Sequence, residues 1–252
     1  MKNKINDNKK TKKFNKIVSI ILFSLLIILV TIIIVFGTKN YKEERIVKDE
    51  LEIINSLNAS VDTIDMDIKA SGNYGKVEQA MKEYYQDYFK KKKIFNENRV
   101  EAIFNTFTVD YLKENKSKLK KLKLKEMVDT KTNELNEAVN DIIDMLNSNN
   151  VMSYVDKYDL DSYYNDFYRD IMVSKNDSKI QKEWQDLIEN NNEKAGYLKE
   201  VIDILVNNTN DWYIKDDTLY FSSDSLLEKY NKLHSVIYED IKLDNEISDI
   251  SL

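Results

Sequence analysis

The sequence contains no cysteine and no proline, only four glycines and a single histidine in 252 residues. Without cysteine, the chain forms neither disulfides nor thiolate metal sites. Proline makes up about 5% of an average protein, so its absence favours long helices joined by simple turns. One histidine excludes sites that need two imidazoles, such as H-E-x-x-H. His234 follows Leu233 in a helical pattern, which is typical of a surface or boundary residue rather than a catalytic one.

Other patterns associated with chemistry are incomplete. The stretch GNYGKV, residues 72–77, lacks the spacing and the Ser or Thr of a phosphate loop. Acidic clusters at 62–67 and 156–166 lack the glycine and the distal glutamate of an EF-hand loop, and are typical of helix faces and caps. Sixteen tyrosines, many at helical spacing, favour core positions. We therefore predict a protein that is not an enzyme and has no metal and no cofactor.

The apolar stretch IVSIILFSLLIILVTIIIVFG, residues 17–37, carries no charge. A helix needs about 20 apolar residues to cross the roughly 30 Å of hydrocarbon in a bilayer. A secretory signal has an apolar region of only about 7–15 residues and a small-residue cleavage site, whereas the first alanine here is Ala59. The sequence therefore predicts a transmembrane helix over 17–37 that is retained, with a cleaved signal as the alternative.

Seven lysines and one acid precede this run, and Lys39, Lys42, Arg45 and Lys48 follow it. Because Lys and Arg favour the cytoplasmic side, the N-terminus is expected inside the cell and the bulk of the chain outside. The predicted division is a basic cytoplasmic arm (1–16), a single transmembrane helix (17–37), an extracytoplasmic helical domain (38–240) and an acidic flexible tail (241–252). Beyond the arm lie 31 basic and 43 acidic residues, a net charge of −12 that excludes ordinary nucleic-acid binding.

Apolar residues recur every three or four positions along most of the predicted exterior domain. This period predicts a coiled-coil-like seam over 47–68, compatible with a homo-oligomer, and then a turn at 71–73. Further helices are expected at 74–107 with a kink or loop, at 128–146, at 160–171 and at 180–205, the last interrupted by Gly196. Alternation around Asp216 and Asp217 predicts a β-hairpin near 212–221, and Ser222 or Ser223 and a Ser225–Glu228 capping box begin a final helix. The fold class is therefore all-α: a multi-helix bundle with one small β-hairpin.

The stretch KSKLKKLKLK, residues 116–125, concentrates positive charge in an otherwise acidic domain. Lysines early in a helix oppose its dipole, so a compensating role is expected. The candidate site for an anionic partner consists of Lys116, Lys118, Lys120, Lys121, Lys123 and Lys125. Lipid headgroups, a phosphate-bearing wall polymer and an acidic protein face all fit this chemistry. The alternative is a solvated face whose lysine stems cover Leu119 and Leu122.

Two stretches, NDWYIKDDTLYFSSDSLLEKYN (210–231) and KVEQAMKEYYQDYF (76–89), resemble uncharacterised helical surface proteins of low-GC Gram-positive bacteria. Those proteins are held at the cell surface by an N-terminal membrane anchor or a lipid. The resemblance implies this topology and a helical fold, and it implies no activity.

These observations together predict a membrane-tethered, non-enzymatic interaction module of the bacterial cell envelope, located in the cell membrane. Its expected partners are the membrane itself and another envelope protein or an anionic envelope polymer. An envelope enzyme that uses Asp or Glu residues is the alternative, because folding can bring any two carboxylates together. A regulator of a neighbouring membrane complex is the third hypothesis.

Overall fold

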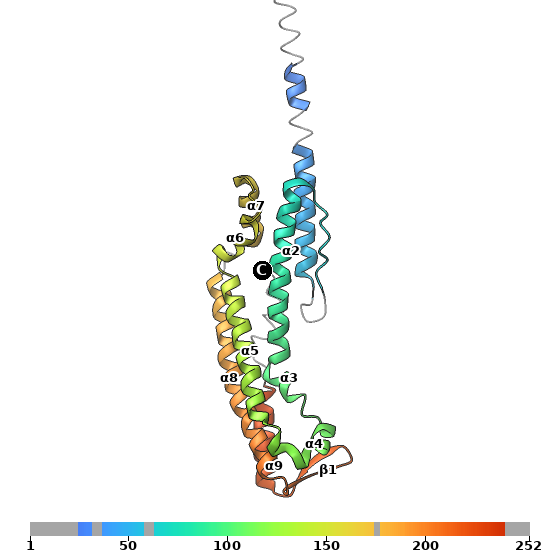
Figure 1. Ribbon diagram of the computed structural model, residues 1–252, viewed down its shortest axis with the longest axis vertical. Coiled ribbons are helices and arrows are strands. Elements are labelled where there is room, and N and C mark those ends of the chain that lie inside the picture. Colours follow the sequence, from blue (N-terminus) through green and yellow to red (C-terminus); the bar gives the residue numbers. More distant parts are fainter. Residues whose placement is uncertain (1–24, 32–36, 58–62, 174–176, 240–252) are drawn as a thin grey trace, which may run out of the picture.

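The computed structural model describes residues 25–31, 37–57, 63–173 and 177–239. They form an elongated helical bundle with one short hairpin, which confirms the predicted fold class (Figure 1). Two helices over 25–31 and 37–55 come first. The elements that follow are α2 (Gly72–Asn98), α3 (Val100–Phe104), α4 (Val109–Asn115), the 3₁₀ helix η1 (Lys116–Lys121), α5 (Leu124–Met145), α6 (Ser148–Asp156), α7 (Ser162–Met172), α8 (Asp177–Asn207), β1 (Trp212–Lys215), β2 (Thr218–Phe221) and α9 (Asp224–Ile237).

Most of the predicted transmembrane segment 17–37 lies outside the described residues, as do the basic arm 1–16 and the tail 241–252. Within the described ranges, none of the helices has both the length and the apolar character needed to span a bilayer. Of the segment 17–37, residues 25–31 and 37 are described; they are helical and exposed.

The predicted seam over 47–68 is correct only in its first half. Val47 and Ile54 are buried in the helix over 37–55 and pack in the same core as α2. The helix ends at residue 55, and residues 63–69 are extended and lie against α2 instead of continuing the helix (Figure 1). Ile68 is consequently 40% exposed. The first half of the seam therefore packs against α2 of the same chain. The second half is not helical, because polar contacts of the extended segment, described below, stabilise the extended conformation more than its apolar period stabilises a helix.

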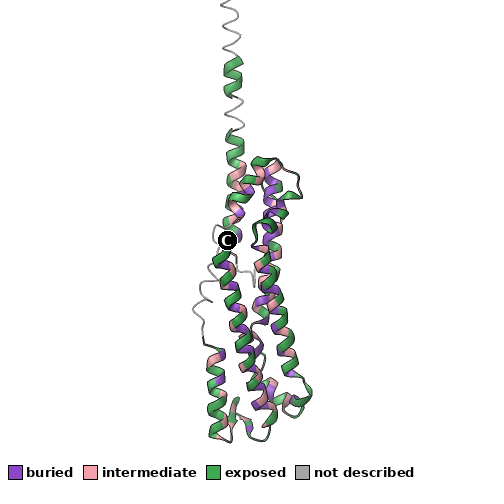
Figure 2. Ribbon diagram, turned by 90° about the vertical axis from the view of Figure 1, so that its left-hand side faces the viewer, coloured by how far each residue is buried: buried purple, intermediate pink, exposed green. Residues whose placement is uncertain are grey.

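The three longest helices form the body of the bundle. Helix α5 runs antiparallel to α2: Asn98, at the end of α2, bonds to Glu134, and Lys91, two turns earlier in α2, pairs with Asp141, two turns later in α5. Helix α8 packs on α5. Their inward stripes form two core clusters, one containing Tyr84 and Trp184 and the other containing Leu198 and Trp212. Figure 2 shows these buried stripes along helices whose outer faces are exposed.

Some of the helix boundaries expected from the sequence are observed, and others differ. The kink or loop expected within 74–107 occurs at Arg99, where the backbone turns to ψ 146°. The polar run at 147–150 does not simply end a helix, because Asn147 accepts a hydrogen bond from the Asn149 amide and caps α6. Gly196 does not interrupt α8, which continues through it.

The predicted hairpin is confirmed. Trp212 pairs with Phe221 and Lys215 with Thr218, and both turn residues, Asp216 and Asp217, have positive φ. That conformation matches a type I′ turn, the geometry that fits the twist of a two-residue hairpin. The cap of α9 is Ser223, whose hydroxyl accepts from the Leu226 amide, rather than Ser225.

The bundle has two distinct ends (Figure 1). At the end that we call the stem end, the first turns of the helix over 37–55 meet the start of α2 and α7. Here the Ser71 amide donates to Glu43, and the hydroxyls of Tyr74 and Tyr163 lie 3.0 Å apart. At the opposite end, which we call the tip, lie α4, η1 and the hairpin.

Candidate anion-binding surface

The six candidate lysines lie at the tip, but not early in one helix as the sequence suggested. Residues 116–121 form η1, and Lys123 adopts a left-handed conformation (φ 48°) before α5 begins at Leu124. A 3₁₀ helix has three residues per turn, so η1 presents three edges. Leu119 occupies one edge and is buried in the core. Lys118 and Lys121 share a second edge, and Lys120 lies on the third.

Lys116 is a structural residue. Its ammonium donates to the Trp212 carbonyl at 2.5 Å and lies 4.4 Å from the centre of the Trp212 ring. The indole in turn donates to the Leu205 carbonyl at 2.9 Å. Lys116 therefore fastens the hairpin to η1 and has little capacity left for a ligand.

Two more of the six lysines have carboxylate partners. Lys125 bonds to both oxygens of Asp203 in α8, at 2.8 and 3.0 Å. Lys123 pairs with Glu126 at 2.9 Å, but both side chains are more than 60% exposed. Pairs this exposed contribute about 0–1 kcal/mol, so Lys123 exchanges partners easily.

Lys118, Lys120 and Lys121 are the uncompensated charges of the surface. All three are exposed, and within the described ranges none of their ammonium groups makes a hydrogen bond or an ion pair. The structure thus reduces the predicted six-lysine site to a three-lysine centre, which we call the tip lysines, with Lys123 at its edge.

A shallow hollow of about 130 Å³ lies beside the tip lysines, between η1, the start of α5 and the end of α8. Lys120, Lys123 and Lys125 line it, but so do the carboxylates of Glu126 and Asp203. Because Glu126 pairs with Lys123 and Asp203 with Lys125, only Lys120 of this lining lacks an acid partner among the described residues, and the cationic surface is the exposed ridge of η1.

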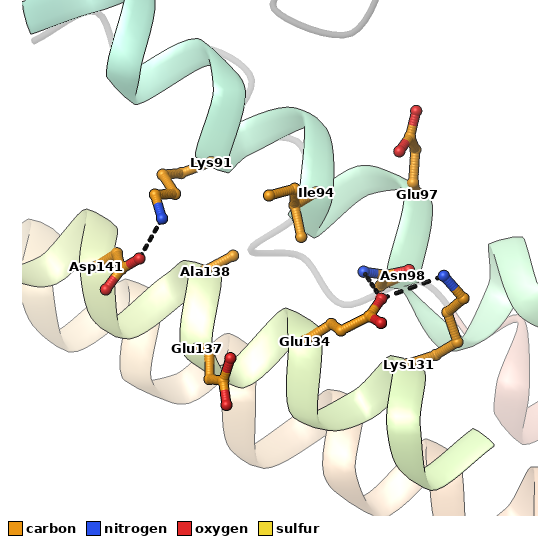
Figure 3. A pocket seen from close by; sticks show the side chains of 9 residues that line it. All are labelled: Lys91, Ile94, Glu97, Asn98, Lys131, Glu134, Glu137, Ala138 and Asp141. Atoms are coloured by element: carbon orange, nitrogen blue, oxygen red, sulfur yellow. Dashed lines mark hydrogen bonds and ion pairs between the residues drawn. The ribbon is translucent and has the colours of Figure 1, made fainter. Parts of the chain in front are cut away.

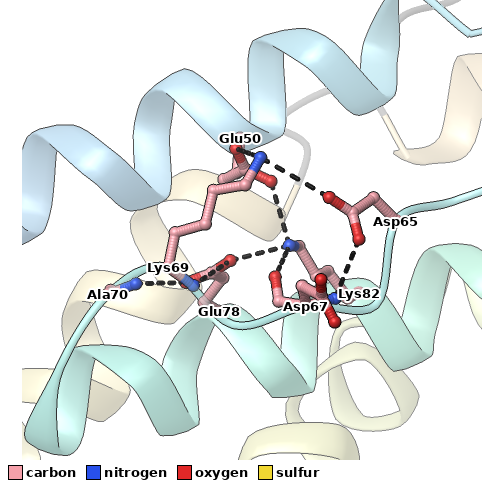
Figure 4. Close-up of polar contacts among 7 residues, drawn as sticks. All are labelled: Glu50, Asp65, Asp67, Lys69, Ala70, Glu78 and Lys82. Carbon is pink, nitrogen blue, oxygen red and sulfur yellow. Dashed lines mark hydrogen bonds and ion pairs between the residues drawn. The ribbon is translucent and has the colours of Figure 1, made fainter.

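A second polar cluster, which the sequence did not reveal, lies near the stem end (Figure 4). Lys82 is fully buried and donates to Glu50 at 2.9 Å, to Glu78 at 2.7 Å and to the Asp67 carbonyl at 2.5 Å. Glu78, also fully buried, accepts from the backbone amides of Lys69 and Ala70. The Lys69 ammonium completes the cluster by donating to Glu50 at 2.6 Å. We call Glu50, Lys69, Glu78 and Lys82 the buried ion-pair network.

This network joins three segments: the helix over 37–55, the extended residues 67–70 and α2. All three ammonium protons of Lys82 have acceptors, so the buried charge is fully hydrogen-bonded. Burial acts to raise the pKa of Glu50, but hydrogen bonds from Lys69 and Lys82 outweigh it and lower the pKa below its ordinary value of 4.5. The only sequence signal is the i, i+4 pair Glu78–Lys82 within an apolar stripe.

Gly75 allows the extended segment to approach α2. A β-carbon at this position would lie 2.7 Å from the Ala70 carbonyl oxygen and 3.3 Å from a methyl carbon of Ile68. The absence of a side chain therefore places the Lys69 and Ala70 amides within reach of Glu78.

Carboxylates suited to an enzyme are found together in a hollow of about 250 Å³ between α2 and α5 (Figure 3). Its acidic side chains are Glu97, Glu134, Glu137 and Asp141. Lys91 pairs with Asp141, and Lys131 with Glu134, which neutralises two of the four. Across the described residues, no group of three or more His, Cys, Asp or Glu side chains is arranged to hold a metal ion.

The other sequence candidates have structural roles. His234 is exposed and lies among the rings of Phe104, Tyr230 and Tyr238. Asp161 caps α7, and Asp166 pairs with Arg169.

The core interpretation of the tyrosines holds for α2 but not throughout, because Tyr41, Tyr163, Tyr213, Tyr220 and Tyr238 are exposed. Tyr84, Tyr85 and Tyr88 are buried, and burial raises the pKa of each phenol, so they remain neutral packing residues.

No protein-family model matches the chain, and no curated protein or solved structure is similar to it at a significant level.

Proposed function

We propose that this chain is a single-pass membrane protein whose helical bundle stands on the outer face of the cell membrane as a non-enzymatic interaction module of the envelope. The apolar run over 17–37 supplies the membrane segment, and the seven lysines before it hold the N-terminus in the cytoplasm. The tip lysines are the contact surface for the partner.

The observation that carries this proposal is the buried ion-pair network. A flexible linker after a membrane segment would let the domain move independently of it. Here Glu50, on the helix that follows the apolar run, is bonded to Lys82 of α2 inside the protein. Glu43, one and a half turns from Gly37, accepts from the Ser71 amide. The helix over 37–55 and the bundle are therefore one connected body, and in this proposal the stem end faces the bilayer and the tip points away from it.

Membrane insertion and orientation are tested in intact cells that express the full chain with a C-terminal epitope. We expect the chain to resist alkaline extraction, and protease added outside the cells to remove the epitope. The control variant carries Ile27→Lys and Leu29→Lys, since each lysine near the middle of a membrane helix costs about 2.5–3.5 kcal/mol. This variant should become extractable. An extractable wild type, or an epitope that resists protease until the cells are lysed, overturns the proposal.

The interaction role is tested by crosslinking in the same cells. Changing the tip lysines to glutamine should remove crosslinked products, whereas changing Glu97 and Glu137 in the hollow between α2 and α5 should not. Loss of crosslinks with the carboxylate variant instead would favour the enzyme hypothesis. Products that consist of one membrane complex would identify the chain as a regulator of that complex.

A further inference from the structure

The position of the tip lysines limits which anions they reach. The Ser71 amide bonds to Glu43, six residues after Gly37, so the stem end lies about 9 Å along the helix from the end of the apolar run. Helix α2 then extends through 27 residues, about 40 Å, toward the tip. At physiological salt, electrostatic attraction is screened over about 8 Å. Headgroups of the membrane that holds the chain are therefore too far away to attract the tip lysines.

The composition of the surface disfavours an acidic protein face. The chain has three arginines, Arg45, Arg99 and Arg169, and none lies at the tip. Arginine is enriched in protein interfaces and binds carboxylates with two parallel hydrogen bonds, whereas lysine is depleted there and binds phosphate as a point charge. Leu122, 36% exposed, is the one large apolar side chain of the lysine-rich stretch that reaches the surface. The exposed aromatic rings of the tip, Tyr213 and Tyr220, lie on the hairpin and not on η1.

The shape of the surface suits a chain-like ligand. The tip lysines project from two edges of a convex 3₁₀ helix, and Lys118 and Lys121 are about 6 Å apart along its axis. In the neighbouring hollow, Glu126 and Asp203 pair with Lys123 and Lys125, which leaves Lys120 alone to hold a single bound anion. A flexible polymer with closely spaced charges, in contrast, can bend over the ridge and contact all three lysines at once.

We propose that Lys118, Lys120 and Lys121 bind a linear phosphate-bearing polymer located beyond the membrane surface. This inference rests on the proposed function, because it takes the stem end as the membrane side. Binding is by charge and multiple weak contacts rather than by a shaped pocket, so it should depend strongly on salt and weakly on the chemistry between the phosphates.

The test uses the full chain in nanodiscs of zwitterionic lipid and labelled long-chain inorganic polyphosphate as the probe. For a flexible polyanion, each charge contact lowers the slope of log affinity against log salt concentration by about 0.7. Three lysine contacts therefore predict that affinity falls about 20-fold between 50 and 200 mM salt. Lys118→Gln, Lys120→Gln and Lys121→Gln together should weaken binding at 50 mM about tenfold or more and flatten the salt slope by about two.

The matched control changes Lys76, Lys182 and Lys232 to glutamine. These lysines are also exposed and, within the described ranges, their ammonium groups also lack hydrogen-bond and ion-pair partners. The control has the same net charge as the tip variant, so its binding should stay within about twofold of wild type. Equal loss in both variants would mean that net charge alone governs binding, which overturns the site.

Two further probes separate the alternatives. Poly-L-glutamate of matched charge should bind about tenfold more weakly than polyphosphate, and equal binding would favour an acidic protein face and refute the proposal. Phosphatidylglycerol vesicles added to the nanodiscs should not compete with polyphosphate; displacement of the polymer would assign the lysines to lipid. None of these binding measurements depends on the cellular topology. The polymer proposal can therefore fail while the extraction and protease results still support the membrane topology, and the membrane topology can fail while the polymer binds as expected.

Discussion

Replacing Lys82 with methionine tests the buried ion-pair network most directly, because methionine has nearly the same length and no charge. The ammonium group is inaccessible to solvent and satisfies Glu50, Glu78 and the Asp67 carbonyl. Its loss leaves Glu78 buried with backbone donors alone and Glu50 with Lys69 alone. Breaking a buried pair by removing one partner costs about 3–5 kcal/mol, a large part of the 5–15 kcal/mol that stabilises a typical domain.

Lys69→Met is the matched control. Its ammonium also bonds to Glu50, but the side chain is 47% exposed and the backbone amide that donates to Glu78 is unchanged by the substitution. Because water replaces the lost contact, we expect a cost of about 0–1 kcal/mol. The two variants remove the same charge from the same cluster and differ mainly in burial.

The assay is urea unfolding of the full chain in zwitterionic micelles, followed by tryptophan fluorescence. Trp184 and Trp212 report on the two core clusters. With a slope of about 2 kcal/mol per molar urea, Lys82→Met should lower the midpoint by about 1.5–2.5 M, and Lys69→Met by less than about 0.5 M. Combining Glu50→Gln with Lys82→Met should cost about 1–3 kcal/mol less than the sum of the single changes. Equal midpoints for Lys82→Met and Lys69→Met would refute the argument.

Three further outcomes are expected from the same unfolding measurements. Gly75→Ala should cost about 1–3 kcal/mol because its β-carbon meets the Ala70 carbonyl, whereas Gly196→Ala, with open space around it in α8, should stabilise by about 0.5–1 kcal/mol. Asp217→Gly should stabilise the hairpin by about 1 kcal/mol, because its φ of 52° is strained for any residue but glycine; no change would exclude such strain. A hydrogen bond from the Ser71 backbone lowers the pKa of Glu43, and hydrogen bonds from lysines lower the pKa of Glu50 and Glu83 against the raising effect of burial. The stability from these carboxylates is therefore present above about pH 4.5 and lost as pH falls toward their folded pKa values; a midpoint that instead falls between pH 7 and pH 5 would contradict this assignment.

The apolar periodicity of the sequence correctly predicted two kinds of element: helices with an uninterrupted apolar stripe, and elements that pack against residues close in sequence. Helix α5 is correct because Val128, Leu135, Val139 and Ile142 all face the core. The hairpin is correct because its strands and its turn are adjacent. The sequence offers Ser222, Ser223 and Ser225 as caps of α9, and the hydroxyl of Ser223 is the one that accepts from the Leu226 amide.

The errors come from contacts between residues distant in sequence. Ile64 and Ile68 fit a helical seam, yet the segment is extended because Glu78 binds its amides and Lys82 binds the Asp67 carbonyl. No local rule indicates that residues 8 to 15 positions away supply these bonds. In the same way, the six lysines were equivalent in sequence, and only tertiary partners separated Lys116, held on Trp212, from the exposed Lys120.

The charge distribution also determines how a polyanion would approach the tip. The chain beyond its first 16 residues has a net charge of −12, so the flanks of the bundle repel the ligand that the tip lysines attract. Lys91, Lys131 and Lys199 do not change this, because Lys91 and Lys199 pair with acids of α5 and Lys131 pairs with an acid one turn away in its own helix. Because screening limits both effects to about 8 Å, the polymer feels attraction only when it meets η1 itself. A polyanion should therefore bind across η1 at the tip, and added salt should weaken the repulsion from the flank of the bundle without turning it into attraction.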